Sequence, residues 1–232
     1  MPFSEDQVKA SLDELKTPDL TNWQSFAEGN GFKVFRKPVP GSALFEYKAI
    51  GGFTDVPPRY FMRAYTDLEF RQTWDKYMGG WKTLGDKKDR FHYVSKFPWP
   101  LSNRDYVYDL RVQEFQEGKV IYMNGHSVED KACPAKSGTV RVDQYRQDLV
   151  VTPTEDGNGC NIVFFYWDDP KGNIPTSVVN WAAKSGIPGF LSSLRDAGIS
   201  LMKKDAAEKV DEKRVGLDKD ASSTPVPGTV CG

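Results

Sequence analysis

The chain has 232 residues, of which 39% are hydrophobic and 13% aromatic, so it can bury the core of one large domain. Its 31 lysines and arginines nearly balance its 32 aspartates and glutamates, which leaves a net charge of −1. A chain with this balance has no long-range field to hold DNA or RNA, and we expect no nucleic-acid partner.

The sequence lacks signals for secretion or membrane insertion. The first fifteen residues carry charges throughout, and no apolar run reaches the roughly 18 residues of a membrane span. The three cysteines, Cys133, Cys160 and Cys231, form an odd number without the paired spacing of a disulfide framework or zinc site. No lipidation motif is present at either end. We therefore expect a cytoplasmic protein without a lipid anchor.

The N-terminal part predicts one helix, a hairpin and two short helices. A capping-box pattern at the start predicts a helix through about Leu15. Two strand-like runs follow at 32–39 and 44–53, joined by a Pro-Gly-Ser turn. Over 57–77 apolar residues recur at helical spacing with a break near Thr66, which predicts two short helices.

The remainder predicts a sheet followed by a long helix. Strand-like runs, separated by turn residues, lie at 91–96, 106–115, 120–125, 138–151 and 161–167. Pro175 suits the first turn of a helix whose apolar stripe continues to Leu201. Gly186 and Pro188 interrupt this stripe, so we expect a kink near Ile187.

The order of these elements describes one α+β domain over residues 1–204. An antiparallel sheet with one covering helix can curl around that helix and enclose a cavity. Residues 205–232 are charged at first and then rich in Ser, Thr, Pro and Gly, with few large apolar side chains. This composition predicts a disordered tail.

Motifs for catalysis, metals and cofactors are missing. Residues 125–129 come nearest to a G-x-S-x-G elbow and fail at the last position. His92 and His126 lie outside any metal-binding pattern, and no glycine-rich phosphate loop is present. We expect no enzymatic activity, no catalytic residue, no metal and no cofactor.

Four segments carry a specific resemblance to a known family. They are YTDLEFRQTWDKY at 65–77, KFPWPLSNRDYVY at 96–108, SGTVRVDQYRQ at 137–147, and IPTSVVNWAAK at 174–184 followed by GIPGFL at 186–191. Over roughly residues 3–204 the chain resembles START domains, and most strongly their phosphatidylcholine-transfer branch. The resemblance implies a helix-grip fold, in which a curved antiparallel sheet wraps around a long C-terminal helix and encloses a lipid cavity.

A phospholipid carrier identifies its cargo by the headgroup. Acyl chains, at about 0.8 kcal/mol per buried CH₂, contribute similarly in membrane and protein. Choline's quaternary ammonium has no hydrogen-bond donor and is best recognised by aromatic faces. The resemblance assigns a choline cage to Tyr93, Tyr106 and Tyr145, although each also fits an ordinary half-buried strand tyrosine. Where the family has tryptophan, this chain has Tyr93, so strict preference for choline stays open.

The resemblance also assigns the phosphate to Arg71, with Tyr65 and Gln147 as neutral donors. A guanidinium can donate charge-assisted, bidentate hydrogen bonds to a phosphate in a dry cavity. The alternative is that Arg71 pairs with Asp75 on an exposed helix, a contact that contributes only a few tenths of a kcal/mol. Gln147 lies two residues beyond Tyr145 and therefore on the same strand face.

Four other motif residues have structural expectations. Arg104 and Asp105 are adjacent in a strand, so they should face opposite ways and make separate contacts. Trp181 and Phe190 should pack the closing helix rather than touch the headgroup.

The sequence thus predicts a monomeric lipid-transfer protein that binds one phosphatidylcholine-like phospholipid and contacts membrane surfaces transiently while exchanging it. The C-terminal helix and an adjacent loop are the expected gate. Two alternatives remain open. One is a START protein of broader selectivity that also binds phosphatidylethanolamine, and the other is a lipid-gated regulator of a partner protein.

Overall fold

The computed structural model describes residues 5–42, 44–86, 88–172, 174–175, 177–178 and 186–221. The helices are α1 (Glu5–Lys16), α2 (Pro58–Thr66), α3 (Leu68–Trp74) and α5 (Ile187–Ala221). The strands are β1 (Gln24–Gly29), β2 (Phe32–Pro38), β3 (Phe45–Phe53), β4 (Met78–Thr83), β5 (Arg90–Ser95), β6 (Asn103–Phe115), β7 (Val120–Ser127), β8 (Thr139–Val142), β9 (Tyr145–Pro153) and β10 (Cys160–Asp168).

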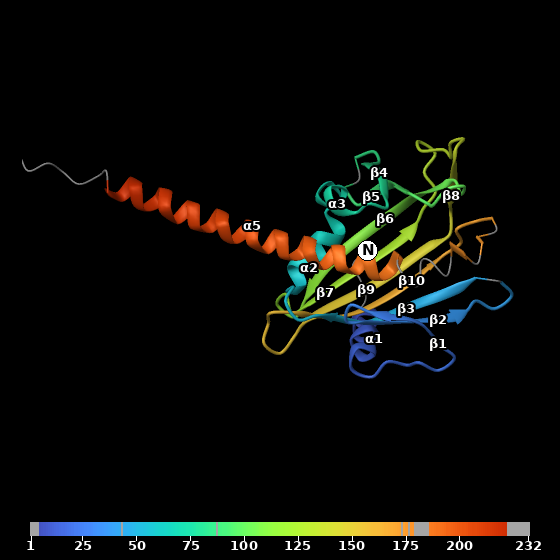
Figure 1. Cartoon of the computed structure of the whole chain (residues 1–232), viewed down its shortest axis with the longest axis horizontal. Helices are drawn as coiled ribbons and strands as arrows, with labels where there is room; N and C mark the ends of the chain where they lie inside the picture. Colours follow the sequence, from blue (N-terminus) through green and yellow to red (C-terminus); the bar gives the residue numbers. More distant parts are fainter. Residues whose placement is uncertain are drawn as a thin grey trace, which may run out of the picture.

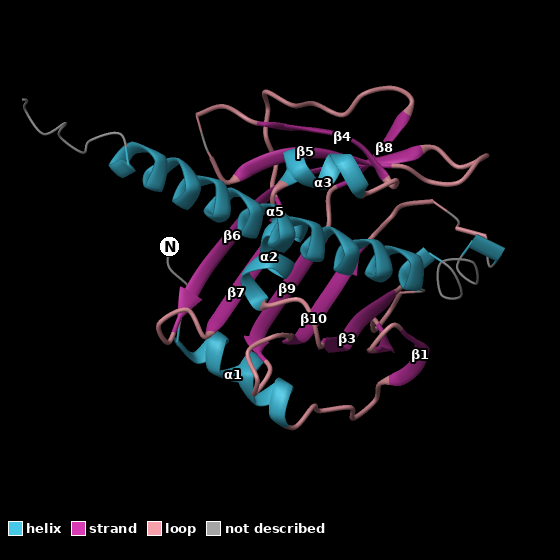
Figure 2. Ribbon diagram, turned by 60° about the vertical axis from the view of Figure 1, so that its left-hand side comes forward, coloured by secondary structure: helices cyan, strands magenta, loops and turns pink. Residues whose placement is uncertain are grey.

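The ten strands form one curved, open sheet that wraps around α5 (Figures 1 and 2). Their order is β1-β2-β3-β10-β9-β7-β6-β5-β4, and β8 lies beside β6. Neighbouring strands are antiparallel except β6 and β8, which are parallel. The helix-grip architecture implied by the resemblance is therefore confirmed.

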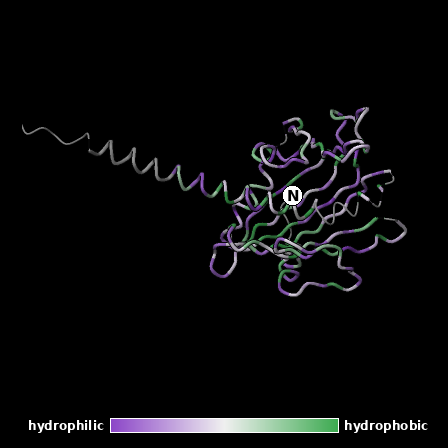
Figure 3. Tube along the Cα trace, viewed as in Figure 1, coloured by the Kyte–Doolittle hydropathy of each residue, from purple (hydrophilic) through white to green (hydrophobic). Residues whose placement is uncertain are grey.

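Alternating strand side chains build a core on each face of the sheet. In β7, Ile121 and Met123 point to the concave face and pack with α2 and α5, while Val120 and Tyr122 point to the convex face and pack under α1. Both sets are buried, and the hydrophobic segments gather in the central strands (Figure 3). The sheet is thus covered on both faces, with α1 on one side and α5 on the other.

The two short helices predicted over 57–77 are confirmed as α2 and α3. The break lies at Asp67, whose side chain accepts a hydrogen bond from the backbone N–H of Phe70 at 3.0 Å and so caps α3. Pro58 occupies the first turn of α2, where its missing N–H is harmless. The break places the end of α2 and the start of α3 over the concave face.

Helix α5 lies against the concave face through an apolar stripe of Leu194, Ala197 and Leu201, all buried. Gly198 brings the backbone of α5 so close to Val56 that a Cβ there would lie 2.6 Å from its Cγ1. None of the helices among the described residues is long and apolar enough to cross a bilayer.

The predicted kink near Ile187 falls at the edge of what the structure describes. Helix α5 begins at Ile187, Gly186 belongs to a wider π-type turn, and Ser177 and Val178 are helical. Residues 179–185, with Trp181, lie outside the described residues. So do the first residues of the capping box at the N-terminus.

Two strands were missed, and one predicted run divides. β1 and β4 are the two edge strands, and their polar or glycine-containing sequences, QSFAEG and MGGWKT, lack the apolar alternation of a half-buried strand. The run at 138–151 is two strands, because the chain leaves β6 after Val142 and joins the sheet again beside β7 from Tyr145.

The tail differs from expectation over its first part. We expected disorder from residue 205, but α5 continues to Ala221 and projects beyond the sheet (Figure 1). Residues 205–221 include three alanines, three lysines and two glutamates, all of which favour helix. Lys204 and Glu208 lie 4.0 Å apart at i, i+4.

Candidate functional site

The six predicted site residues converge on the concave face beneath α3. Tyr65 lies near the end of α2, Arg71 in α3, Tyr93 in β5 and Tyr106 in β6, with Tyr145 and Gln147 in β9. β7 would separate β6 from β9, but it ends at Ser127, which pairs with Tyr108. Beyond that point the rings from β6 and β9 meet directly.

The three predicted cage tyrosines are in mutual contact. Tyr93 and Tyr106 are paired across β5 and β6, with ring centroids 6.2 Å apart. The ring of Tyr106 meets that of Tyr145 edge-on at 5.4 Å. Burial raises the pKa of Tyr93 to about 12, so its hydroxyl stays neutral at physiological pH. The structure thus brings the three side chains together, while their binding role remains a prediction.

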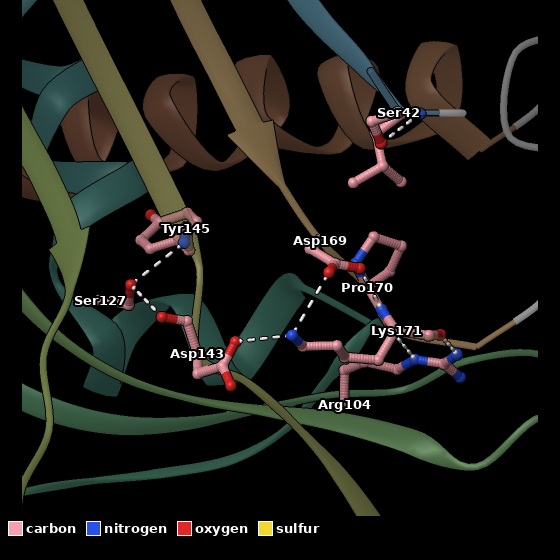
Figure 4. Close-up of polar contacts among 9 residues, drawn as sticks. Ser42, Arg104, Ser127, Asp143, Tyr145, Asp169, Pro170 and Lys171 are labelled. Atoms are coloured by element: carbon pink, nitrogen blue, oxygen red, sulfur yellow. Dashed lines mark hydrogen bonds and ion pairs between the residues drawn. The ribbon is translucent and has the colours of Figure 1, made fainter. Parts of the chain in front are cut away.

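Ser127 fixes the backbone at this meeting point (Figure 4). Its hydroxyl donates to the carbonyl of Asp143 at 2.8 Å and accepts from the N–H of Tyr145 at 3.1 Å. These bonds join the end of β7 to the start of β9. They hold Tyr145 where it faces β6.

Arg71 lies among these rings. Its guanidinium carbon is 4.7 Å from the ring centre of Tyr65, 5.5 Å from that of Tyr93 and 5.4 Å from that of Phe190. Its Nε donates to Asp75 Oδ2 at 2.9 Å. The pair that we considered as an alternative does form, yet it is buried, with side-chain exposures of 13% for Arg71 and 1% for Asp75. Phe190, expected to be a packing residue only, covers the guanidinium.

The two neutral donors are bonded to each other. The hydroxyl of Tyr65 donates to Gln147 Oε1 at 2.9 Å, which orients the amide so that its NH₂ group faces away from that bond. Gly125 makes room for this amide, since a Cβ on it would lie 2.9 Å from Gln147 Nε2. Gln147 is buried, as a headgroup donor in a dry site has to be.

Sequence reasoning missed three further residues of the site. Tyr108 and Tyr166 contact the ring of Tyr145 at 5.7 and 5.8 Å. Asp168 Oδ2 accepts hydrogen bonds from the hydroxyls of Tyr106 and Tyr166, both at 2.9 Å. Spacing offered a signal, because Tyr108 lies two residues after Tyr106 and Asp168 two residues after Tyr166. The aromatic wall is therefore larger than predicted, and it contains a carboxylate.

Arg104 holds the turn that follows Asp168 (Figure 4). Its guanidinium donates to the carbonyls of Pro170 at 2.9 Å and Lys171 at 3.0 Å. It also donates to the carbonyl of Ser102 at 2.6 Å. The clamp links the loop before β6 to the turn after β10.

Asp105 points the other way from Arg104, as expected. One of its oxygens, Oδ2, accepts from Arg141 Nη2 at 2.8 Å and lies 2.9 Å from His92 Nε2. Burial raises the pKa of Asp105, but these hydrogen bonds outweigh burial and hold it below its ordinary value. The expectation of separate structural contacts is confirmed.

The described side chains between the sheet and α5 pack against one another. Two pockets, of about 570 and 340 Å³, adjoin α1 instead, and they include Leu12 and Ile50 in the first and Ser11 and Trp23 in the second. Neither is the cavity predicted between the sheet and α5, where the described side chains of the concave-face core pack against one another.

Comparison with known proteins gives the family. The model of the START domain matches residues 4–204. Phosphatidylcholine transfer protein of Mus musculus is 36% identical over 200 residues, which cover 83% of this chain and 92% of the relative. StAR-related lipid transfer protein 7, mitochondrial, of Homo sapiens is 30% identical over 210 residues, covering 87% of this chain and 57% of the relative.

Among solved structures, human STARD10 is similar in fold, with a TM-score of 0.71 at 19% identity, covering 99% of this chain and 92% of that one. The named relatives are lipid-transfer proteins, which supports a lipid-transfer function and no enzymatic one. With the family model matched over nearly the whole described domain and relatives above 30% identity, this chain belongs to the START-domain family.

Proposed function

We propose that this protein is a cytosolic, monomeric carrier that removes one phosphatidylcholine from a membrane, holds it between the sheet and α5, and delivers it to another membrane. The observation that carries the proposal is the buried arginine, Arg71, set among tyrosine rings on the concave face. The identity to phosphatidylcholine transfer proteins supports the same cargo. Transfer of this kind involves no covalent chemistry.

Arg71 and its neighbours suit the phosphate half of the headgroup. The guanidinium is already desolvated and bonded on one edge to Asp75, so a phosphate would gain charge-assisted hydrogen bonds without first removing a full hydration shell. The NH₂ group of Gln147 lies beside it as a neutral donor, and the Tyr65 hydroxyl orients that amide. In our proposal the phosphate displaces the ring faces that now cover Arg71.

The rings suit the choline half. A quaternary ammonium gains on the order of 0.5–2 kcal/mol from each aromatic face when both are desolvated. Tyr93, Tyr106 and Tyr145 supply three such faces within contact of one another. Because tyrosine is a weaker cation–π partner than the tryptophan of the family at position 93, phosphatidylethanolamine is the second candidate cargo.

Transient membrane contact is part of the proposal, and Trp99 supports it. This side chain is 93% exposed on the loop between β5 and β6, with a proline on either side. Tryptophan favours the interface between headgroups and acyl chains. Arg104 joins this loop to the turn after β10, so the loop lies next to the turn that follows Asp168.

The test has two parts. Native mass spectrometry of the purified protein should find one phosphatidylcholine per chain, and an equal share of phosphatidylethanolamine would favour the second candidate. Purified protein and vesicles alone should then move labelled phosphatidylcholine from donor to acceptor. Binding without transfer would favour a lipid-gated regulator, and binding of neither lipid would overturn the proposal. Arg59→Ala, at an exposed residue in the first turn of α2, is the control and should behave as wild type.

A further inference from the structure

Asp168 is a half-buried carboxylate beside the tyrosine wall. It is the last residue of β10, paired with Tyr145 of β9, and its Oδ2 takes both tyrosine hydrogen bonds, from Tyr106 and Tyr166. Among the described residues it forms no ion pair. Arg104 attracts it from a longer distance, but the donors of Arg104 are bonded to backbone carbonyls. The negative charge of Asp168 is thus incompletely compensated.

A carboxylate in this position is costly for the fold. Burial without a cationic partner disfavours the charged form, and here burial raises the pKa of Asp168 even though two tyrosine hydroxyls donate to it. A neutral side chain of the same shape would serve packing equally well. The charge therefore points to a bound cation, since perturbed titratable groups in a polar site often mark binding.

A series of contacts connects the two charges of the site. Arg71 lies at one end, 5.5 Å from the ring of Tyr93, which contacts Tyr106, whose hydroxyl reaches Asp168 at the other end. The positive and negative ends therefore bracket the rings. A zwitterionic headgroup carries a negative phosphate followed by a positive ammonium. Its phosphate can therefore face Arg71 while its ammonium faces Asp168.

The hydrogen bonds also act on the rings themselves. A phenol that donates a hydrogen bond to a carboxylate becomes more electron-rich, because hydrogen-bonded groups polarise one another where the local dielectric constant is low. Tyr106 and Tyr166 both donate to Asp168, and both contact the ring of Tyr145. Their faces should attract a cation more strongly than those of unbonded tyrosines.

We propose that Asp168 is the residue by which this protein selects phospholipids with a cationic headgroup over phospholipids whose headgroup carries no positive charge. Arg71 alone would accept any phosphate, so the second half of the headgroup needs its own determinant. The inference rests on the proposed function and adds a selectivity residue to it. We expect Asp168 to attract choline and ethanolamine headgroups alike, because both are cations.

The test uses full-length protein and vesicles that contain equal amounts of phosphatidylcholine, phosphatidylethanolamine and phosphatidylglycerol with the same acyl chains. Lipids bound by the re-isolated protein are counted by mass spectrometry. Asp168→Asn keeps an acceptor for both tyrosine hydroxyls and removes the charge. We expect the ratio of cationic-headgroup lipids to phosphatidylglycerol to fall about tenfold or more. Asp169→Asn is the control, since Asp169 pairs with Lys171, and its ratio should not change.

Asp168→Glu separates charge from shape, and it should keep a ratio well above that of Asp168→Asn. The inference is overturned if Asp168→Asn binds lipid with the wild-type ratio, or if the glutamate variant loses selectivity to the same extent as the asparagine variant. An asparagine variant that does not fold would also count against it, because we expect the neutral side chain to be tolerated. If wild-type protein extracts none of the three lipids, the proposed function fails instead.

Discussion

Arg71 is tied to a carboxylate that has no other basic partner among the described residues. Asp75 is 1% exposed, accepts from Arg71 Nε at 2.9 Å, and receives the backbone N–H of Tyr77 on its other oxygen. Breaking such a pair by removing one member leaves an uncompensated buried charge. The phosphate-binding residue of our proposal therefore also has a structural role.

The first prediction separates these two roles. Arg71→Ala should lose bound phospholipid and destabilise the fold by about 3–5 kcal/mol, because Asp75 is left without a counter-charge. Arg71→Ala combined with Asp75→Asn should recover much of that stability and still carry no phospholipid. Urea unfolding and the phospholipid content of the purified proteins measure the two effects. Wild-type lipid content in the folded double variant would remove Arg71 from the binding site.

The second prediction concerns the charge of Asp168 and pH. Its pKa is raised in the folded protein, so the native state binds the proton more tightly than the unfolded chain and loses stability as pH rises through the folded pKa. Asp168→Asn should therefore unfold at higher urea than wild type at pH 7. The difference should shrink as pH falls and the wild-type carboxyl is protonated. An asparagine variant less stable than wild type at pH 7 would contradict this.

Asp105 is the matched control, because its pKa is shifted in the direction opposite to that of Asp168. Its folded pKa is lowered, so the carboxylate stabilises the fold at neutral pH, and this contribution is lost as pH falls through the folded pKa. Asp105→Asn should be less stable than wild type at pH 7, with the difference vanishing in acid. Unfolding curves for both variants across the same pH range check the two signs together.

At the scale of elements, the position of α5 depends on a close approach to the start of α2. A Cβ at Gly198 would lie 2.6 Å from Val56 Cγ1, closer than unstrained atoms approach. Two ion pairs near the ends of this contact, Arg195 with Asp55 and Arg63 with Asp205 at 3.1 Å, are partly exposed to solvent and contribute little. Packing at Gly198 and along the apolar stripe is what fixes α5.

The third prediction tests this contact. Gly198→Ala should destabilise the protein by about 1–3 kcal/mol through overpacking, although alanine favours helix over glycine by about 1 kcal/mol. In a Val56→Ala background the same change should be neutral or stabilising, because the clashing methyl group is gone. A double-mutant cycle of unfolding free energies measures the coupling. Equal costs of Gly198→Ala in both backgrounds would show that the two elements are not in contact there.

At the scale of the whole molecule, the proposed transfer cycle needs a membrane-facing end, and Trp99 marks it. The fourth prediction is that Trp99→Ala lowers the rate of phosphatidylcholine transfer between vesicles about fivefold or more, since an exposed tryptophan gains by entering the interface. Bound phospholipid should be unchanged. Val112→Ala, another exposed apolar residue, is the control and should transfer at the wild-type rate. A parallel loss of bound lipid would mean that Trp99 shapes the site rather than contacting membranes.

Local patterns determined most of the elements. The break between α2 and α3, the hairpin of β2 and β3, and the strands of the central sheet followed from periodicity and turn residues, because each depends on neighbours in the sequence. The edge strands β1 and β4 escaped detection, since an edge buries too little to need an apolar pattern. The C-terminal part of α5 was not predicted as helix because it has few large apolar residues, although its alanines and lysines favour helix.

The sequence by itself determined the fold class and, through the family motifs, the six residues that meet under α3. Alternation placed Tyr145 and Gln147 on one face, because the period of a strand is a local property. Only the tertiary structure decided that Tyr106 reaches Asp168, 62 residues away, and that the pair of Arg71 and Asp75 is buried. Which strands become neighbours, in which register, and what covers them depends on the whole chain, so no local pattern encodes those contacts.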